Sequence, residues 1–181
     1  MNSDKGVLVC VLDFDDTIFP TYWLDVMDEL FTNNLLSIDE VVSEMFSCLL
    51  KTCVIYIVSS ASVEWLERSL LRIPNTHKII KANRIEIISA KNTKKEFHFK
   101  DIYDKHPEAE LIAALGDGME EMVGCHKLRI VHKFRNKILK VRFKNKPTWN
   151  ELVTQQKMVI NHWEEWIKHE RKDLNIKLID K

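Results

Sequence analysis

The sequence predicts an α/β fold in which helices and strands alternate around a mostly parallel sheet. Residues 7–12 and 54–58 are continuous apolar runs rich in β-branched side chains, which is typical of strands buried on both faces of a parallel sheet. Helical patterns separate these runs, as in βαβ crossovers. Glycine and proline are scarce, with 4 of each in 181 residues. This scarcity excludes a low-complexity chain and a β-sandwich with glycine-bearing turns.

Seven segments have the pattern of a strand. Residues 7–12 and 54–58 are the clearest, because their side chains are almost all apolar. Residues 111–115 are a further apolar run. The remaining four segments mix or alternate apolar and polar side chains, and they are residues 84–88, 128–134, 138–143 and 174–178.

Capping signals and prolines set the predicted helix boundaries. Ser37 and Thr148 are each followed three residues later by a glutamate, which is the spacing of a capping box at a helix start. Pro74 and Pro107 disfavour helical backbone in the residues before them and so end two helices. The five predicted helices are residues 22–36, one that begins at 37, 62–72, 95–105 and 148–171.

Length and continuity predict a single domain over residues 1–181, with a Rossmann-like, three-layer parallel sheet. No internal repeat or long linker divides it. Residues 21–52, between the first two strands, are the one candidate insertion and hold at most two helices. Residues 148–181 are expected to add a C-terminal helix and a short strand.

Cysteine use and the N-terminal sequence indicate the compartment. The four cysteines form no CxxC pair, and Cys10 and Cys53 lie inside apolar runs, which predicts buried free thiols in a reducing compartment. The first residues lack the pattern of a signal peptide. No apolar run approaches the roughly 18 residues that span a bilayer. We therefore expect a cytoplasmic protein without a membrane partner.

Charge is divided unevenly along a chain whose net charge is zero. Residues 1–126 contain 12 basic and 21 acidic residues, whereas residues 127–181 contain 15 and 6. Residues 127–146 alone contain nine Lys and Arg and no acid. This basic stretch has two interpretations. It could attract nucleic acid or another polyanion, or it could be the solvated face of a strand pair, which the lack of interleaved aromatic residues favours.

Polar and charged residues gather where the predicted strands end, and ligands of parallel α/β sheets bind at the carboxyl ends of strands. Each group by itself is typical of a turn, a helix cap or a solvated surface. Together they place carboxylates, hydroxyls and a cation at one edge of the sheet. In chain order the groups are Asp13, Asp15, Asp16 and Thr17; Ser59 and Ser60; Lys91, Lys94, Lys95 and Lys100; and Gly116, Asp117, Gly118 and Glu121.

These residue types predict a site for Mg²⁺ and a phosphoryl group. Asp13 and Asp117 offer hard oxygen ligands of the kind that Mg²⁺ takes while keeping several waters. The Ser59 hydroxyl and the backbone N–H groups of the helix behind it can hold phosphate oxygens. A lysine adds a positive point charge for the same anion.

The motifs resemble those of the haloacid dehalogenase-like hydrolases, a superfamily of aspartate-nucleophile phosphatases. The first family motif, D-x-D-x-T after a buried strand, is matched in full by residues 13–17. An apolar strand that ends in Ser59 matches the second, a lysine before the fourth strand the third, and Gly116-Asp117 with Glu121 the acidic fourth. The resemblance covers residues 7–121 and implies a fold with a minimal helical cap.

The resemblance also implies a role for each matched residue. Asp13 attacks phosphorus and forms an aspartyl-phosphate, and Asp15 exchanges protons with the leaving group and with water. The implied phosphate-binding residues are Thr17, Ser59, Ser60 and Lys95, and the implied Mg²⁺ ligands are Asp13, Asp15 through its carbonyl, Asp117, and Glu121 through a bound water. The spacing alone leaves Lys94 and Lys100 as alternatives to Lys95.

A finer resemblance extends over almost the whole chain, to a branch of this superfamily from protists, algae and large viruses. The matching segments are residues 15–21 (DDTIFPT), 88–90 (ISA), 94–99 (KKEFHF) and 142–147 (RFKNKP). The sequence departs from the branch at Lys94, where the branch has tryptophan, and at Gly118, where it has a small hydroxyl residue.

The sequence therefore predicts a Mg²⁺-dependent phosphatase that hydrolyses a phosphomonoester, and the small insertion favours bulky substrates such as phosphoproteins or nucleic-acid ends alongside small molecules. The alternative is a catalytically weak binding module on the same fold that recognises a phosphorylated or nucleic-acid partner. A receiver-type signalling domain is disfavoured, because its phosphate acceptor would follow the third strand, where this chain has Ser89 and Ala90.

Overall fold

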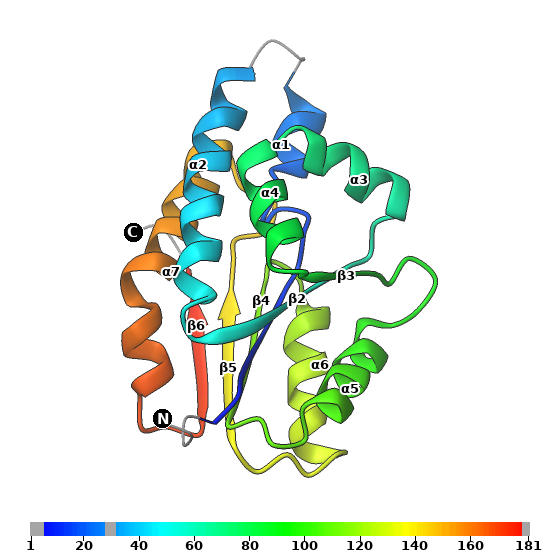
Figure 1. Cartoon of the computed structure of the whole chain (residues 1–181), viewed down its shortest axis with the longest axis vertical. Coiled ribbons are helices and arrows are strands. Elements are labelled where there is room, and N and C mark those ends of the chain that lie inside the picture. Colours follow the sequence, from blue (N-terminus) through cyan, green and yellow to red (C-terminus); the bar gives the residue numbers. More distant parts are fainter. Residues whose placement is uncertain (1–5, 28–31, 179–181) are drawn as a thin grey trace.

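The computed structural model describes residues 6–27 and 32–178, which fold around a six-stranded sheet (Figure 1). The strands lie in the order β3-β2-β1-β4-β5-β6, and every neighbouring pair is parallel. The predicted α/β class and Rossmann-like three-layer architecture are thus confirmed. The strands are β1 (Leu8–Leu12), β2 (Cys53–Ser59), β3 (Glu86–Ser89), β4 (Leu111–Gly116), β5 (Lys137–Arg142) and β6 (Asp173–Lys177).

Helices cover both faces of the sheet, as Figure 1 shows. On one face α2 contacts both α4 and α7, and on the other α5 and α6 pack together. The helices are α1 (Thr21–Val26), α2 (Thr32–Leu49), α3 (Val63–Leu71), α4 (Pro74–Ala82), α5 (Lys95–Lys105), α6 (Met119–Ile130) and α7 (Trp149–Lys168).

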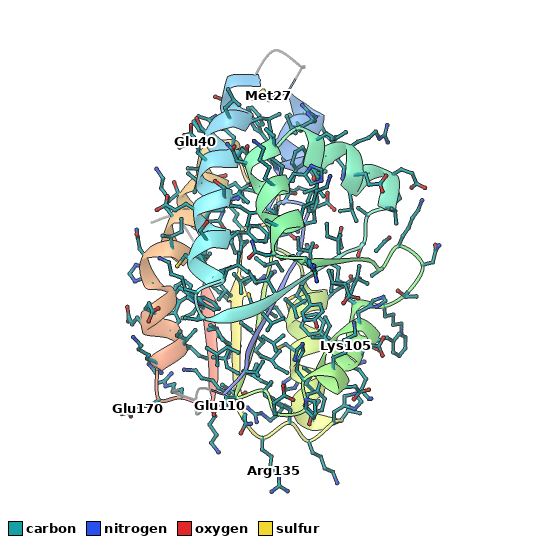
Figure 2. All side chains as sticks on the ribbon, viewed as in Figure 1. Met27, Glu40, Lys105, Glu110, Arg135 and Glu170 are labelled. Atoms are coloured by element: carbon teal, nitrogen blue, oxygen red, sulfur yellow. The ribbon has the colours of Figure 1, made fainter. Side chains whose placement is uncertain are left out.

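The strand side chains supply both hydrophobic cores, one on each face of the sheet. In β1, Cys10 and Leu12 belong to the core beneath α2 and α7, whereas Val9 and Val11 belong to the core beneath α5 and α6. Side chains fill both layers, as Figure 2 shows. Because successive residues of a strand point to opposite faces, burial on both sides requires the continuous apolar runs seen in the sequence.

The predicted insertion, residues 21–52, forms α1 and α2. Helix α2 packs against α7 and α4 and thus belongs to the helical layer beside the sheet. The predicted helix start at Ser37 is wrong, because α2 runs through this position. Leu35, Ile38 and Val42 are all buried, so one apolar stripe continues across Ser37 and overrides the local capping signal. Part of the predicted helix 22–36 lies at residues 28–31, outside the described residues.

The predicted strand at residues 128–134 is also wrong, since α6 continues to Ile130. Met122, Cys125 and Leu128 are buried at three-residue spacing, which is helical periodicity. The local alternation of apolar and polar residues that suggested a strand covers only the last turn of this helix and the loop after it. The basic stretch 127–146 is therefore the end of a helix, a loop and β5, not a strand pair.

Helix α4 was not predicted, although Pro74 at its first turn is a recognised helix-start signal. Its N-cap residue, Ile73, makes no side-chain hydrogen bond to the first turn of the helix. The buried Asp39 of α2 accepts hydrogen bonds from the backbone N–H groups of Asn75 (2.9 Å) and Thr76 (2.8 Å). A side chain 37 residues earlier in the chain thus satisfies donors that a local cap would otherwise bind.

The C-terminal part follows the prediction. Thr148 caps α7, and its side chain and that of Glu151 form the predicted capping box. Strand β6 then pairs with β5 and completes the sheet. Among the described residues, no helix has the length and apolar character needed to cross a membrane.

Candidate active site

The carboxyl ends of the three central strands bring the predicted residues together. Leu12 of β1 is in register with Ile57 of β2 and with Leu115 of β4. Asp13 follows β1, and its backbone N–H donates to the carbonyl oxygen of Leu115 at 2.8 Å. The connection after β1 leads to β2 on one side of β1, whereas the connection after β3 leads to β4 on the other side of β1. The boundary between β1 and β4 is therefore the switch point, which is where such folds bind ligands.

Asp13 lies at this edge of the sheet and is buried, with only 6% of its surface exposed. Its Oδ1 accepts hydrogen bonds from the Phe14 N–H at 2.8 Å and from the Lys95 ammonium group at 2.7 Å. Burial raises the pKa of Asp13 well above its usual value, and the carboxylates of Glu121 and Asp117 raise it further, whereas Lys95 opposes the shift. The carboxylate is therefore fixed in place but short of positive charge.

Lys95 is the cation of the site. It is the first residue of α5, 4% exposed, and its Nζ contacts both Asp13 and Glu121. Burial by itself would lower the pKa of Lys95, but the two carboxylates outweigh it and raise the pKa. The sequence alternatives lie elsewhere: Lys94 is exposed at the N-terminus of α5, and Lys100 pairs with Asp104 at the surface.

Glu121 comes from α6 and is 1% exposed. Its Oε1 binds Lys95, while its buried Oε2 has no hydrogen-bond partner among the described residues. Two glycines make room for it. A Cβ at Gly116 would lie 2.8 Å from Oε2, and one at Gly118 would lie 3.1 Å from it. The glycine pair on either side of Asp117 thus serves the close approach of a buried carboxylate.

Asp117 completes a cluster of three carboxylates around one lysine. Its pKa is raised by burial and by Glu121, and a hydrogen bond with Asp13 and the charge of Lys95 oppose the shift. The side chains of Asp13 and Asp117 therefore interact directly. Three carboxylates and one ammonium group leave an excess of negative charge in a buried place, which a divalent cation would offset.

The donor side chains at this edge have the chemistry that Mg²⁺ requires. Within residues 6–27 and 32–178, no three His, Cys, Asp or Glu side chains are grouped to hold a metal ion together. Mg²⁺ needs no such group, because it binds through one or two carboxylates and keeps its waters. Asp13 and Asp117 fit that requirement, and the partnerless Oε2 of Glu121 fits an acceptor for a metal-bound water.

Asp15 lies two residues after Asp13, is half-buried, and is held by three side-chain donors. The Thr21 hydroxyl (2.5 Å) and the Trp65 indole N–H (3.0 Å) donate to Oδ1, and the Ser59 hydroxyl (3.2 Å) donates to Oδ2. These contacts occupy its carboxylate, so the predicted contribution of Asp15 to a metal is confined to its backbone carbonyl.

The three predicted hydroxyl residues occupy different places. Ser59 is fully buried, donates to Asp15 and accepts from the Ala61 N–H at 3.0 Å. Ser60 is exposed, and its hydroxyl donates to Glu120 at 3.3 Å. Thr17 is fully buried, and its Oγ1 has no hydrogen-bond partner among the described residues. The geometry therefore brings Ser59 to the carboxylates and places Ser60 at the outer rim.

A tight turn carries the first motif across the strand end. The carbonyl oxygen of Phe14 accepts from the backbone N–H groups of Ile18 (2.9 Å) and Phe19 (3.0 Å). Asp16 has a left-handed φ of 55° and accepts from the Tyr22 N–H at 2.9 Å. Burial raises its pKa to about 6, although the Tyr22 bond opposes the shift. Asp16 thus shapes the turn, which agrees with a structural role.

Sequence reasoning missed three residues that hold this turn and the Asp15 carboxylate: Thr21, Trp65 and Gln156. The buried Gln156 of α7 donates to the carbonyl oxygens of Thr17 at 3.0 Å and Ile18 at 3.4 Å. The partners of Trp65 and Gln156 lie 50 and 139 residues away in sequence. No local pattern signals contacts over such sequence distances. Thr21, in contrast, lies inside the segment 15–21 that carries part of the finer family resemblance.

Many cations of the basic stretch have partners within the protein. Lys127 pairs with Glu96, Arg129 with Asp173 at 3.0 Å, and Lys144 with Glu151. The Lys137 ammonium group caps the end of α7 by donating to the carbonyl oxygens of Trp166, Ile167 and His169. These contacts give much of the stretch a structural purpose.

Comparisons of the chain with protein-family models, with curated proteins and with solved structures return no significant match.

Proposed function

We propose that the protein is a Mg²⁺-dependent phosphatase of the haloacid dehalogenase-like type, which hydrolyses a phosphomonoester through a phosphoryl group on Asp13. The observation that carries the proposal is the arrangement around Asp13. Its carboxylate lies beside a lysine, two further carboxylates and the half-buried Asp15, all at the carboxyl edge of the central strands. A structural salt bridge would not require this surplus of buried negative charge.

In the first step, Oδ2 of Asp13 attacks phosphorus while the bond from phosphorus to the leaving oxygen breaks. The Phe14 N–H and Lys95 both bind Oδ1, which fixes the carboxylate and directs Oδ2 at the substrate. Protonated Asp15 gives its proton to the leaving oxygen. The products of this step are the free alcohol and a phosphoryl group on Asp13.

In the second step, Asp15 takes a proton from a water molecule whose oxygen attacks phosphorus. The bond from phosphorus to Oδ2 breaks, inorganic phosphate leaves, and Asp13 is restored as a carboxylate. Lys95 counters the negative charge of the phosphoryl group in both steps. Ser59 can join it when its hydroxyl turns from Asp15 toward a phosphate oxygen, since a hydroxyl has one proton to donate.

Asp13, Asp117 and the carbonyl of Asp15 would hold Mg²⁺, with Glu121 behind a bound water. When bound, the ion supplies positive charge that reduces repulsion between the carboxylates and an incoming phosphate. The raised pKa values of Asp13 and Asp117 support this assignment, because both carboxylates are short of compensating charge.

The proposed substrates are phosphomonoesters on bulky molecules, including phosphoproteins and nucleic-acid ends, together with small phosphate esters. The support for a bulky substrate is that α2, the longer helix of the stretch 21–52, belongs to the layer beside the sheet and does not add to a cap over the site. A screen across these three classes with Mg²⁺ would identify the preferred one.

The first test is hydrolysis of an aryl phosphate by purified protein, with Mg²⁺ and after its removal by chelation. We expect turnover that needs Mg²⁺ and that Asp13→Asn abolishes while the variant stays folded by circular dichroism. Asp25→Asn, an exposed aspartate of α1, is the matched control and should retain turnover. Turnover by Asp13→Asn close to that of the wild type would contradict the nucleophile assignment.

One observation favours a binding module as the second candidate. Asp13, Ser59, Lys95 and Glu121 are almost completely buried, and the last three already bind groups within the site. A protein that held a phosphorylated partner without turnover would bind phosphate or a phosphopeptide in calorimetry but show no hydrolysis with any substrate class. Steady turnover of a phosphomonoester would exclude this candidate.

A further inference from the structure

Asp15 stands out because both its oxygens are bound by side chains from other parts of the chain. Two donors, the Thr21 hydroxyl at 2.5 Å and the Trp65 indole at 3.0 Å, converge on Oδ1. Among the described residues, the Ser59 hydroxyl is the one donor to Oδ2, at 3.2 Å. This asymmetry distinguishes the two oxygens of one carboxylate.

The chemistry of the three donors differs in a way that matters for proton transfer. An indole N–H is a donor only, so Oδ1 must act as an acceptor toward Trp65 in every state of Asp15. A serine hydroxyl can donate or accept. Oδ2 can therefore carry a proton without losing its contact with Ser59, whereas a proton on Oδ1 would compete with the Trp65 N–H, which cannot accept one.

Trp65 is itself held firmly. Its backbone N–H donates to the Ser62 side chain that caps α3, at 3.3 Å. Its ring meets Phe19 edge-on, with centroids 6.3 Å apart and planes at 84°. Phe19 in turn stacks on Phe14, which lies between Asp13 and Asp15 in the chain, and the two ring centroids are 5.7 Å apart. The indole is thus fixed by the same turn that carries the carboxylates.

We infer that Trp65 is a positioning residue that, together with Thr21, reserves Oδ1 of Asp15 as an acceptor and leaves Oδ2 to exchange protons with the leaving group and with water. The inference rests on the proposed function, because it concerns how Asp15 acts in that reaction. It adds a residue of α3 that none of the four sequence motifs contains.

The kinetic test compares Trp65→Phe with the wild type on two substrates, an aryl phosphate with a good leaving group and an alkyl phosphate with a poor one. Phenylalanine keeps an aromatic ring against Phe19 but removes the N–H. Departure of the alkyl alcohol depends strongly on proton donation, whereas departure of the aryl alcohol does not. We therefore expect Trp65→Phe to lower kcat for the alkyl phosphate by about 10-fold or more relative to its effect on kcat for the aryl phosphate. The change should appear in kcat rather than KM.

Trp166→Phe is the matched control, because Trp166 lies near the end of α7 and stacks on His162. It should leave the ratio of the two activities as in the wild type. Equal losses on both substrates in Trp65→Phe would mean a merely structural role and would overturn the inference. Thr21→Val, which removes the other donor to Oδ1, should shift the ratio in the same direction, and Thr21→Ser should restore it.

A spectroscopic test needs no activity. Each of the five tryptophans gives one indole N–H signal in a ¹H–¹⁵N spectrum, and the signal lost in Trp65→Phe belongs to Trp65. Asp15→Ala should move this signal, whereas Asp25→Ala should not. An unmoved signal in Asp15→Ala overturns the inference whether or not the protein is a phosphatase. Absence of wild-type turnover, in contrast, refutes the proposed function while this signal still reports the contact.

Discussion

The ammonium group of Lys95 lies 2.7 Å from Oδ1 of Asp13, and both side chains are almost fully buried. The same ammonium group binds Glu121. One cation thus pairs with two carboxylates, one that follows β1 and one from α6. Since Asp117 adds a third carboxylate, the charge of Lys95 is essential to this part of the protein.

Replacing Lys95 by methionine should therefore damage both stability and activity. The change leaves buried carboxylates without their cation, which costs about 3–5 kcal/mol when one partner of a buried pair is removed. Chemical denaturation would measure this loss. Lys94→Met, at the exposed neighbouring position, should change the free energy of unfolding little. Equal stability of the two variants would contradict the charge argument.

The glycine before Asp117 offers a steric test. A Cβ at Gly116 would lie 2.8 Å from Oε2 and 2.9 Å from Cδ of Glu121, so Gly116→Ala must displace the carboxylate that binds Lys95. We expect a destabilisation of about 1–3 kcal/mol, the usual cost of overpacking, and a fall in turnover. Gly118→Ala should cost less, because its nearest contact is 3.1 Å. The reverse order in thermal unfolding would refute this reading of the two glycines.

Asp16 predicts a pH dependence of stability. Its pKa in the folded protein is about 6, above the usual 3.8, chiefly because it is buried. The folded state thus binds the proton more tightly than the unfolded chain. Ionisation of Asp16 therefore opposes folding increasingly as the pH rises from about 4 to about 6, and by a constant amount above that.

Asp16→Asn should remove this penalty while it keeps the acceptor for the Tyr22 N–H and tolerates the left-handed backbone. In chelator, the variant should be more stable than the wild type by roughly 1–3 kcal/mol at neutral pH. The difference should shrink as the pH falls below 6. Urea unfolding at several pH values would show it, and a difference independent of pH would exclude the titration of Asp16 as its cause.

Asp39 predicts a purely structural effect. Its two oxygens cap α4 by accepting from Asn75 and Thr76. Asp39→Ala should lower the free energy of unfolding by about 1–2 kcal/mol, as loss of a helix cap does, and Asp39→Asn by less, because one acceptor oxygen remains. Turnover per folded molecule should not change. Glu40→Ala, at the exposed next residue, is the control, and a loss as large as that of Asp39→Ala would argue against capping.

The sequence could predict what local pattern determines. Asp13, Ser59 and Asp117 follow apolar runs that have the pattern of buried strands, so their meeting at one edge follows from parallel pairing. Local sequence patterns do not predict contacts between segments that are distant in the chain. The Asp39 cap of α4, the Trp65 bond to Asp15 and the Gln156 contacts with the turn each depend on how helices pack on the finished sheet.

The two wrong boundaries have the same cause. At Ser37 a capping signal competes with an apolar stripe that continues through α2, and burial of Leu35 and Ile38 wins. At Leu128 a short alternation competes with the helical spacing of Met122 and Cys125, and again the buried face decides. Tertiary packing overrides a local signal that covers only a few residues.

Rapid acid quenching during turnover, followed by peptide mass spectrometry, would show whether Asp13 carries the phosphoryl group. We predict a phosphoryl group on Asp13, in the peptide that contains residues 13–17, which hydroxylamine releases, as expected for an acyl phosphate. Asp15→Asn should accumulate this species, because Asp15 is the base that activates the attacking water. Turnover by the wild type without any modification of Asp13, or with the phosphoryl group on another residue, would rule out Asp13 as the nucleophile.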